Sequence, residues 1–161
     1  MLNKKNIKVY SYTEAKNKAE TYCAYQERSQ QEVRDKLYKL NLHTSQVEEL
    51  IAYLIENNFL NESRFANAYV SGKFRIKKWG RKKIKQGLKL KGIPETIIKK
   101  AFAQIVEEDY LEVLQELIKK KHAELGFKKD VHTKNKLYNY AFSKGYESNL
   151  IFLTLNNNEL D

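Results

Sequence analysis

The residues that could take part in catalysis or metal binding are scattered in this sequence. His43, His122 and His132 have no metal-ligand spacing with one another or with Cys23. The isolated glycines match no phosphate-binding fingerprint. We therefore expect a protein that is not an enzyme and that uses no metal or cofactor.

Binding chemistry is concentrated in one segment, "RIKKWGRKKIKQGLKLKG", residues 75–92, which holds nine Lys or Arg residues and no Asp or Glu. Over residues 63–94 there are eleven basic residues and no acidic one. The rest of the chain keeps 19 of the 30 basic and all 20 acidic residues, a net charge of −1. A solubilising helix face normally mixes both signs, so this segment favours an anionic partner.

Helical periodicity places much of this charge on one side. At about 100° per residue, Lys82, Lys85 and Lys89 lie opposite Ile84 and Leu88. We expect Trp79 either to pack between helical modules or to stack on a base or protein partner. The predicted binding face comprises Arg64, Arg75, Lys77, Lys78, Trp79, Arg81, Lys82, Lys83, Lys85 and Lys89.

Cap and periodicity signals predict that these residues lie on helices. Ser29 with Glu32 and Ser45 with Glu48 read as capping boxes, and Thr13 and Asn61 as further N-caps. Nine helices are expected. Six run over about 13–26, 62–78, 80–91, 109–125, 130–143 and 147–155, and the other three begin near Ser29, Ser45 and Pro94. The apolar stripe of the fourth helix is expected to be Phe65, Tyr69, Gly72 and Ile76. Because no stretch alternates strictly, no sheet is expected.

An internal repeat organises the helices. "LKLKGIPETII" (88–98) aligns with "AFSKGYESNLI" (141–151) and with "LYKLNLHTSQV" (37–47). Each segment contains a helix end, a Gly or Asn, a bulky apolar residue and a new helix. We predict an all-α, elongated array of three tandem three-helix repeats: a leader at 1–12, then 13–60, 61–108 and 109–161 including a short tail.

The cysteine content and the apolar runs of the sequence indicate where in the cell the protein is located. Cys23 is the single cysteine, so no disulfide framework exists, and we expect Cys23 to be a small core residue. The first residues, "MLNKKNIKVY", lack a signal-peptide run, and no stretch reaches 18 apolar residues. These features favour a cytoplasmic protein.

Three segments resemble the signatures of the RecX family of bacterial recombination regulators. They are "ERSQQEVRDKL" (27–37), "YLIENNFLNESRFANAYV" (53–70) and "WGRKKIKQGLKLKGI" (79–93). The matching positions are Arg28, Ser29, Glu32, Lys36, Leu37, Arg64, Phe65, Ala66, Tyr69, Gly80, Ile84, Leu88 and Gly92. Asn61 and Arg81 depart from the family pattern, which usually has Asp and often Pro there.

The resemblance implies a non-enzymatic monomer that binds RecA, the ATPase that forms filaments on single-stranded DNA. It implies inhibition of filament growth, ATP hydrolysis, strand exchange and co-protease activity in DNA repair, recombination and the SOS response. The alternative is a protein that binds single- or double-stranded DNA directly through the basic middle repeat. A nuclease is disfavoured, since clustered acids that could hold a metal are missing from the basic segment.

The predicted array can be tested by small-angle scattering. A compact 161-residue globule has a radius of gyration of about 15 Å. Three repeats that contact only their neighbours must give a larger value at a monomer mass. A radius near the globular value would contradict the array.

Overall fold

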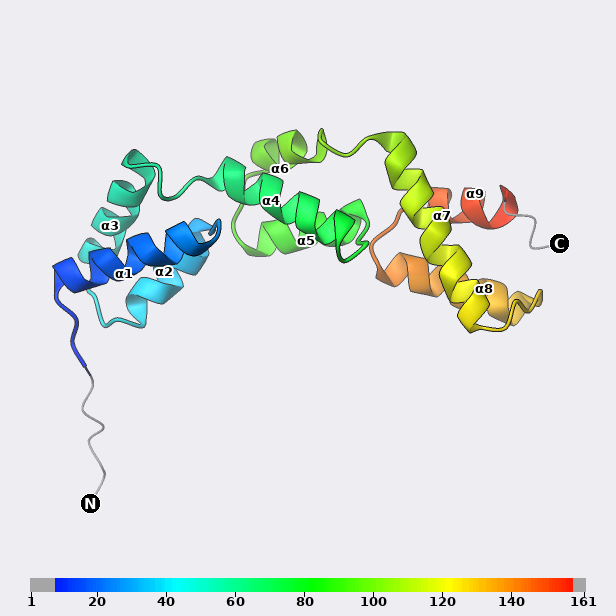
Figure 1. Ribbon diagram of the computed structural model, residues 1–161, viewed down its shortest axis with the longest axis horizontal. Coiled ribbons are helices and arrows are strands. Elements are labelled where there is room, and N and C mark those ends of the chain that lie inside the picture. The colour runs from blue at the N-terminus through cyan, green and yellow to red at the C-terminus, as the bar shows by residue number, and fades with distance from the viewer. Residues whose placement is uncertain (1–7, 158–161) are drawn as a thin grey trace, which may run out of the picture. The chain divides into compact units, whose positions relative to one another are not determined.

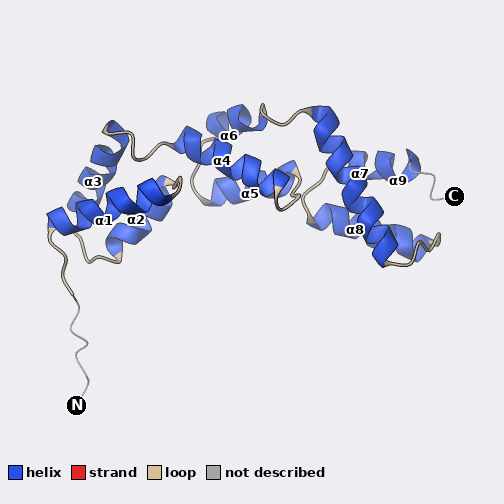
Figure 2. Ribbon diagram, in the orientation of Figure 1, coloured by secondary structure: helices blue, strands red, loops and turns tan. Residues whose placement is uncertain are grey.

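The computed structural model describes residues 8–157, and within them the chain forms nine helices and no strand (Figures 1 and 2). The all-α prediction is confirmed. The helices are α1 (Tyr12–Tyr25), α2 (Gln30–Tyr38), α3 (Thr44–Glu56), α4 (Glu62–Arg75), α5 (Arg81–Leu90), α6 (Glu95–Phe102), α7 (Glu107–Glu124), α8 (Val131–Ser143) and α9 (Ser148–Asn157). Residues 1–7 of the predicted leader and 158–161 of the tail lie outside the described residues.

Two of the predicted N-caps are confirmed. The Ser29 side chain accepts from the Glu32 N–H at 3.2 Å, and Glu32 accepts from the Ser29 N–H at 2.8 Å. The Asn61 Oδ1 accepts from the Arg64 N–H at 2.9 Å. Each cap satisfies N–H groups that the first helical turn leaves without a partner.

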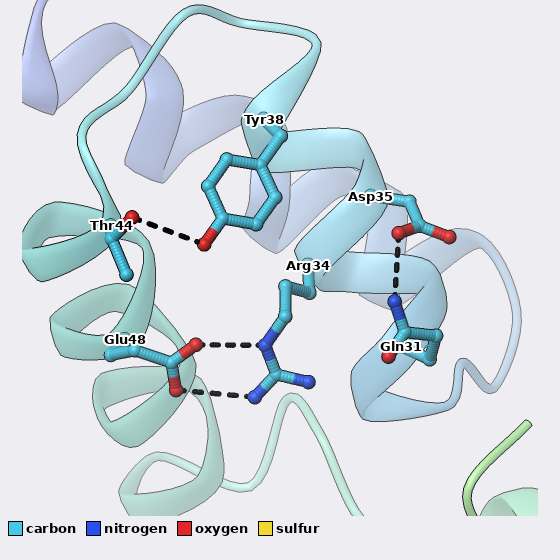
Figure 3. A network of polar contacts seen from close by, with 6 residues as sticks. All are labelled: Gln31, Arg34, Asp35, Tyr38, Thr44 and Glu48. Carbon is cyan, nitrogen blue, oxygen red and sulfur yellow. Dashed lines mark hydrogen bonds and ion pairs between the residues drawn. The ribbon is translucent and has the colours of Figure 1, made fainter.

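Two other predicted starts are wrong. Helix α1 is capped by Ser11 and not by Thr13, because Glu14 completes a capping box with Ser11. Helix α3 begins one residue before Ser45, and Glu48 caps no helix. Figure 3 shows why: Glu48 instead accepts two bonds from Arg34 of α2, at 2.7 and 3.1 Å.

The internal repeat has a backbone signature. Asn41, Gly92 and Gly145 occupy equivalent positions between the second and third helices of each repeat, and their φ angles are 60°, 74° and 98°. This left-handed conformation ends the preceding helix and favours Gly or Asn. The next residue is buried each time: Leu42, Ile93 and Tyr146 are 7%, 4% and 0% exposed.

The chain divides into two compact units. One comprises residues up to 65 with 91–93, and the other comprises 66–90 with 94 onward. The first encloses a core under α1, α2 and α3 that includes fully buried Leu37, Leu50 and Leu54. Cys23 lies in this core, where burial raises the pKa of its thiol to about 11. The unit boundary falls inside the second repeat, and the repeat boundaries at 60/61 and 108/109 remain a prediction.

The core of the second unit joins α5 to the helices that follow. Tyr110 of α7 and Tyr146 are fully buried, with ring centroids 5.1 Å apart, and Phe74 stacks on Tyr110 at 5.8 Å. Gly80 lies directly against the backbone of Gly145, so that a Cβ atom at Gly80 would collide with it.

The predicted apolar stripe of α4 is partly wrong. Ile76 is 77% exposed, whereas Val70 and Phe74 are buried. Helix α4 ends at Arg75, earlier than the predicted residue 78, because Lys78 adopts a positive φ of 57° and the Trp79 N–H bonds to the Lys73 carbonyl. Ile76 lies one residue beyond the end of α4, although its N–H still bonds to the Gly72 carbonyl at 2.9 Å.

We predict that Gly80→Ala destabilises the protein by about 1–3 kcal/mol or more, the usual effect of overpacking. The added methyl group would meet backbone, which cannot rotate away. The measurement is urea unfolding followed by circular dichroism.

Gly72→Ala is the matched control, because nothing lies within 4 Å of the added Cβ and the residue is helical. It should be neutral or stabilising by up to about 1 kcal/mol. Equal effects of both variants would contradict the close approach at Gly80.

Candidate cationic interface

Helix α5 presents the basic face that its periodicity predicts. Ile84 and Leu88 are fully buried, and Gly87 lies against the Tyr69 hydroxyl. On the opposite side a shallow groove of about 390 Å³ is lined by Lys82, Lys85, Gln86, Lys89 and Leu90. The expected juxtaposition of cations on α5 is therefore present.

An acidic residue from beyond the basic segment lies beside this groove. Glu95, at the start of α6, contacts the Lys85 ammonium at 2.5 Å and the Lys89 ammonium at 3.4 Å. The hydrogen bond from Lys85 is the main reason that the pKa of Glu95 is held below its ordinary value. Lys82, which is exposed, is the groove cation without a carboxylate partner among residues 8–157.

Arg81 is engaged inside the second unit. Its guanidinium pairs with Glu107, lies 3.6 Å from Glu147 and covers the Tyr110 ring at 3.9 Å. Burial would lower the pKa of Arg81, but the hydrogen bond to Glu107 together with the charges of the neighbouring acidic groups outweighs it and raises the pKa. Because two carboxylates neutralise it, Arg81 supports the fold more directly than it offers charge to a partner.

The expectation that Arg64 is an exposed cation is wrong. Arg64 belongs to the first unit, where its Nε lies 2.9 Å from Glu27 and its Nη2 donates to the Asn58 carbonyl at 2.7 Å. This half-buried side chain fastens the start of α4 to the end of α1 and to the preceding turn. Arg64, the arginine of the RecX-like segment 53–70, thus has a structural role.

Trp79 is half-buried and lies under two cations. The Lys83 and Lys73 ammonium groups are 4.5 and 4.8 Å from its ring. An indole face attracts cations in this geometry. Packing of Trp79 between helical modules and its stacking on a partner both stay predictions.

The remaining cations of the predicted face lie between α4 and α5. Arg75 and Lys77 are exposed, and Lys78 is half-buried while its carbonyl accepts from the Tyr146 hydroxyl at 2.9 Å. Within residues 8–157 no ion pair joins Arg75, Lys77 or Lys78 to a carboxylate. Exposed Ile76 lies among them, beside a shallow groove of about 220 Å³ along α4.

An aromatic ladder adjoins the basic helix, and the sequence analysis missed it. Tyr138 stacks between Phe142 and Phe152, with ring centroids 5.8 and 4.9 Å apart. Phe142 and Phe152 are 48% and 54% exposed, and the Lys82 ammonium lies 5.7 Å from the Phe142 ring. The spacing of Tyr138 and Phe142, one helical turn apart, was the available signal.

Residues of the first RecX-like segment, 27–37, stabilise the first unit. Leu37 is fully buried, and Ser29 caps α2 together with Glu32. Glu32 also accepts a bond of 2.9 Å from the Lys91 ammonium. The signature positions Ser29, Glu32 and Leu37 thus stabilise the unit, whereas Arg28 and Lys36 contact the face of Tyr22.

Within the described residues no three His, Cys, Asp or Glu side chains gather closely enough to hold a metal ion. None of the described helices has both the length and the hydropathy needed to span a bilayer.

Comparison with known families finds three matches in register along the chain. The models of the first, second and third three-helix domains of RecX match residues 15–54, 61–101 and 107–155. These matches cover most of the chain and follow the order of the predicted repeats.

Individual relatives agree with the family models. Regulatory protein RecX of Clostridium perfringens (strain 13 / Type A) is 32% identical over 161 residues, covering 97% of this chain and 75% of that protein. The protein of the same name from Lactococcus lactis subsp. cremoris (strain SK11) is 28% identical, covering 93% and 57%. The crystal structure of RecX from Lactobacillus salivarius has a TM-score of 0.82 at 27% identity, covering 93% of this chain and 97% of that one.

The Glu32 contacts predict a pH dependence. Burial would raise the pKa of Glu32, but the Ser29 N–H and Lys91 together outweigh it and lower the pKa below the ordinary 4.5. The contribution of a group with a lowered folded-state pKa is present above its unfolded value and disappears as pH falls through the folded value. Glu32→Gln should therefore lower the unfolding temperature at about pH 7, and this deficit should shrink as the pH falls below the ordinary pKa and through the lowered folded-state pKa of Glu32.

The measurement is thermal unfolding of both chains at several pH values. Glu116→Gln, at an exposed position of α7, is the control and should leave the unfolding temperature nearly unchanged throughout. A Glu32→Gln deficit that persisted undiminished in acid would show that the charge is not its cause.

Proposed function

Because the chain belongs to the RecX family, we propose that it binds the RecA recombinase filament on single-stranded DNA and limits filament growth, ATP hydrolysis, strand exchange and co-protease activity. The protein acts as a cytoplasmic monomer by occupying the filament, and it catalyses no reaction itself.

The observation that carries the proposal is the cationic face of the second unit. Arg75, Lys77 and Lys82 are exposed and have no carboxylate partner within residues 8–157. Unpaired surface charge accelerates encounter with an oppositely charged partner and makes the complex sensitive to salt. A filament assembled on DNA offers phosphate groups and acidic side chains to such a face.

Charge alone does not hold a complex together, and the second unit also exposes apolar side chains. Ile76 and Leu90 are 77% and 80% exposed. Buried apolar anchors supply most of the binding energy in protein interfaces, while charges lie at the rim. We assign Ile76 and Leu90 as anchors that a protein partner covers.

A second candidate function is direct nucleic-acid binding by the middle repeat. The observation that favours it is the α5 groove, where Lys82, Lys85 and Lys89 follow one another along a helix. Glu95 already pairs with two of these lysines, which weakens the groove as a phosphate site. Filament binding therefore remains the preferred function.

We predict that the variant Arg75→Glu, Lys77→Glu, Lys82→Glu binds RecA filaments at least about tenfold more weakly, since attraction becomes repulsion. It should also inhibit filament ATPase correspondingly less. The measurements are fluorescence anisotropy against filaments held with a non-hydrolysable nucleotide, and a coupled ATPase assay.

The control variant is Lys119→Glu, Lys120→Glu, Lys136→Glu, which changes charge equally at exposed sites of α7 and α8. It should bind like the natural chain. If both variants lost affinity equally, only net charge would matter, and if neither did, the cationic face would have no part in binding. Binding to bare single-stranded DNA as tight as to the filament would favour the second candidate.

A further inference from the structure

The first unit has a groove that the proposed function does not use. It has a volume of about 550 Å³ and is bounded by residues from α1, α2 and their connections. Three tyrosines and three cations supply its chemistry, namely Tyr10, Tyr22, Tyr25, Lys18, Arg28 and Lys36. None of the described residues that line it is acidic.

The cations of the groove are held over aromatic rings. The Arg28 guanidinium lies 3.8 Å from the Tyr22 ring and donates from Nε to the Tyr22 carbonyl at 3.2 Å. Lys36 lies 5.5 Å from the same ring. Lys18 lies 5.2 Å from the ring of Tyr10.

These cations keep their charge available. Within residues 8–157 none of Lys18, Arg28 and Lys36 forms an ion pair with a carboxylate. Of the acids nearby, Glu32 binds Ser29 and Lys91, and Glu14 accepts from the Ser11 N–H, although the Lys18 charge also acts on Glu14. The groove therefore presents a positive potential beside aromatic surface.

One ring is open to a partner. Tyr25, at the end of α1, is 82% exposed, although tyrosine normally covers part of its ring in a folded domain. Thr21 and Asn17 lie one and two helical turns before it on α1 and also line the groove. An open ring, hydrogen-bonding side chains and unpaired cations are thus brought to one place.

We propose that this groove binds a short stretch of single-stranded nucleic acid. A base stacks on Tyr25, the neighbouring phosphates contact Arg28, Lys18 and Lys36, and the polar side chains of α1 reach the base edge. Sequence-tolerant binders of single strands combine a cationic groove with stacking rings in this way. The site is independent of the cationic face in the second unit and does not rest on filament binding.

An acidic peptide is the competing ligand, and the groove chemistry favours it less. Carboxylates would satisfy the three cations but would leave the exposed Tyr25 ring and the aromatic lining without a matching group. A nucleotide supplies an anion and a flat ring in one repeating unit, so it matches both features.

The test uses the full chain carrying Arg75→Glu, Lys77→Glu and Lys82→Glu, which reverses three exposed cations of the second unit that have no carboxylate partner within residues 8–157. Three probes are compared: an oligothymidylate of about eight nucleotides, an abasic strand of the same length, and a glutamate peptide of equal charge. Tyr25→Ala, Tyr25→Phe and Tyr38→Ala are then made, Tyr38 being an exposed ring of α2 outside the groove. Ultraviolet cross-linking of a bromouracil strand, mapped by mass spectrometry, locates the contact.

We expect the oligothymidylate to bind more tightly than either other probe and to cross-link at Tyr25. Tyr25→Ala should weaken it on the order of tenfold and abolish that cross-link, the loss expected for one stacked base. Tyr25→Phe and Tyr38→Ala should bind like their parent. The proposal is overturned if the abasic strand or the peptide binds as well, or if Tyr25→Ala changes neither affinity nor cross-linking.

Discussion

The close approach of Gly80 to Gly145 determines how the second unit is built. The start of α5 lies on the turn between α8 and α9, and that turn replaces a side-chain cap. The Gly80 N–H donates to the Lys144 carbonyl at 2.8 Å, and the Lys82 N–H donates to the Gly145 carbonyl at 3.0 Å. The Arg81 N–H between them donates to the Tyr110 hydroxyl at 3.0 Å. Three successive donors at a helix start are thus satisfied by the next repeat, which fixes the direction in which α5 presents its lysines.

This arrangement also makes a basic helix start possible. Cations in the first turn oppose the helix dipole, and α5 begins with Arg81, Lys82 and Lys83. Glu107 and Glu147 of the third repeat neutralise Arg81, while the ring of Trp79 lies beneath Lys83. Folding of the third repeat against α5 therefore offsets an unfavourable charge distribution in the second.

The sequence predicted the features that local signals determine. The Ser29 box, the Asn61 cap and the buried face of α5 depend on residues three or four positions apart, and all are present. Pairings across long separations were missed. The basic segment contains no acidic residue, but the fold brings acidic residues from other segments next to it: Glu27 pairs with Arg64 across 37 residues. The end of α4 was missed for a similar reason. The positive φ of Lys78 accompanies a bond from the Tyr146 hydroxyl to the Lys78 carbonyl across 68 residues.

The three repeats retain their interiors and diverge in their exteriors. The equivalent positions Val33, Ile84 and Leu137 are fully buried, as are Leu37, Leu88 and Ala141. The positions beside them differ: Lys36 of the first repeat contacts Tyr22, whereas the second repeat has Gly87 at that position, packed against Tyr69. Packing limits only the inner face of each hairpin, since a buried side chain must fill the space between helices. The outer faces are free to carry different chemistry, so one scaffold holds an aromatic groove in its first repeat and a cationic helix in its second.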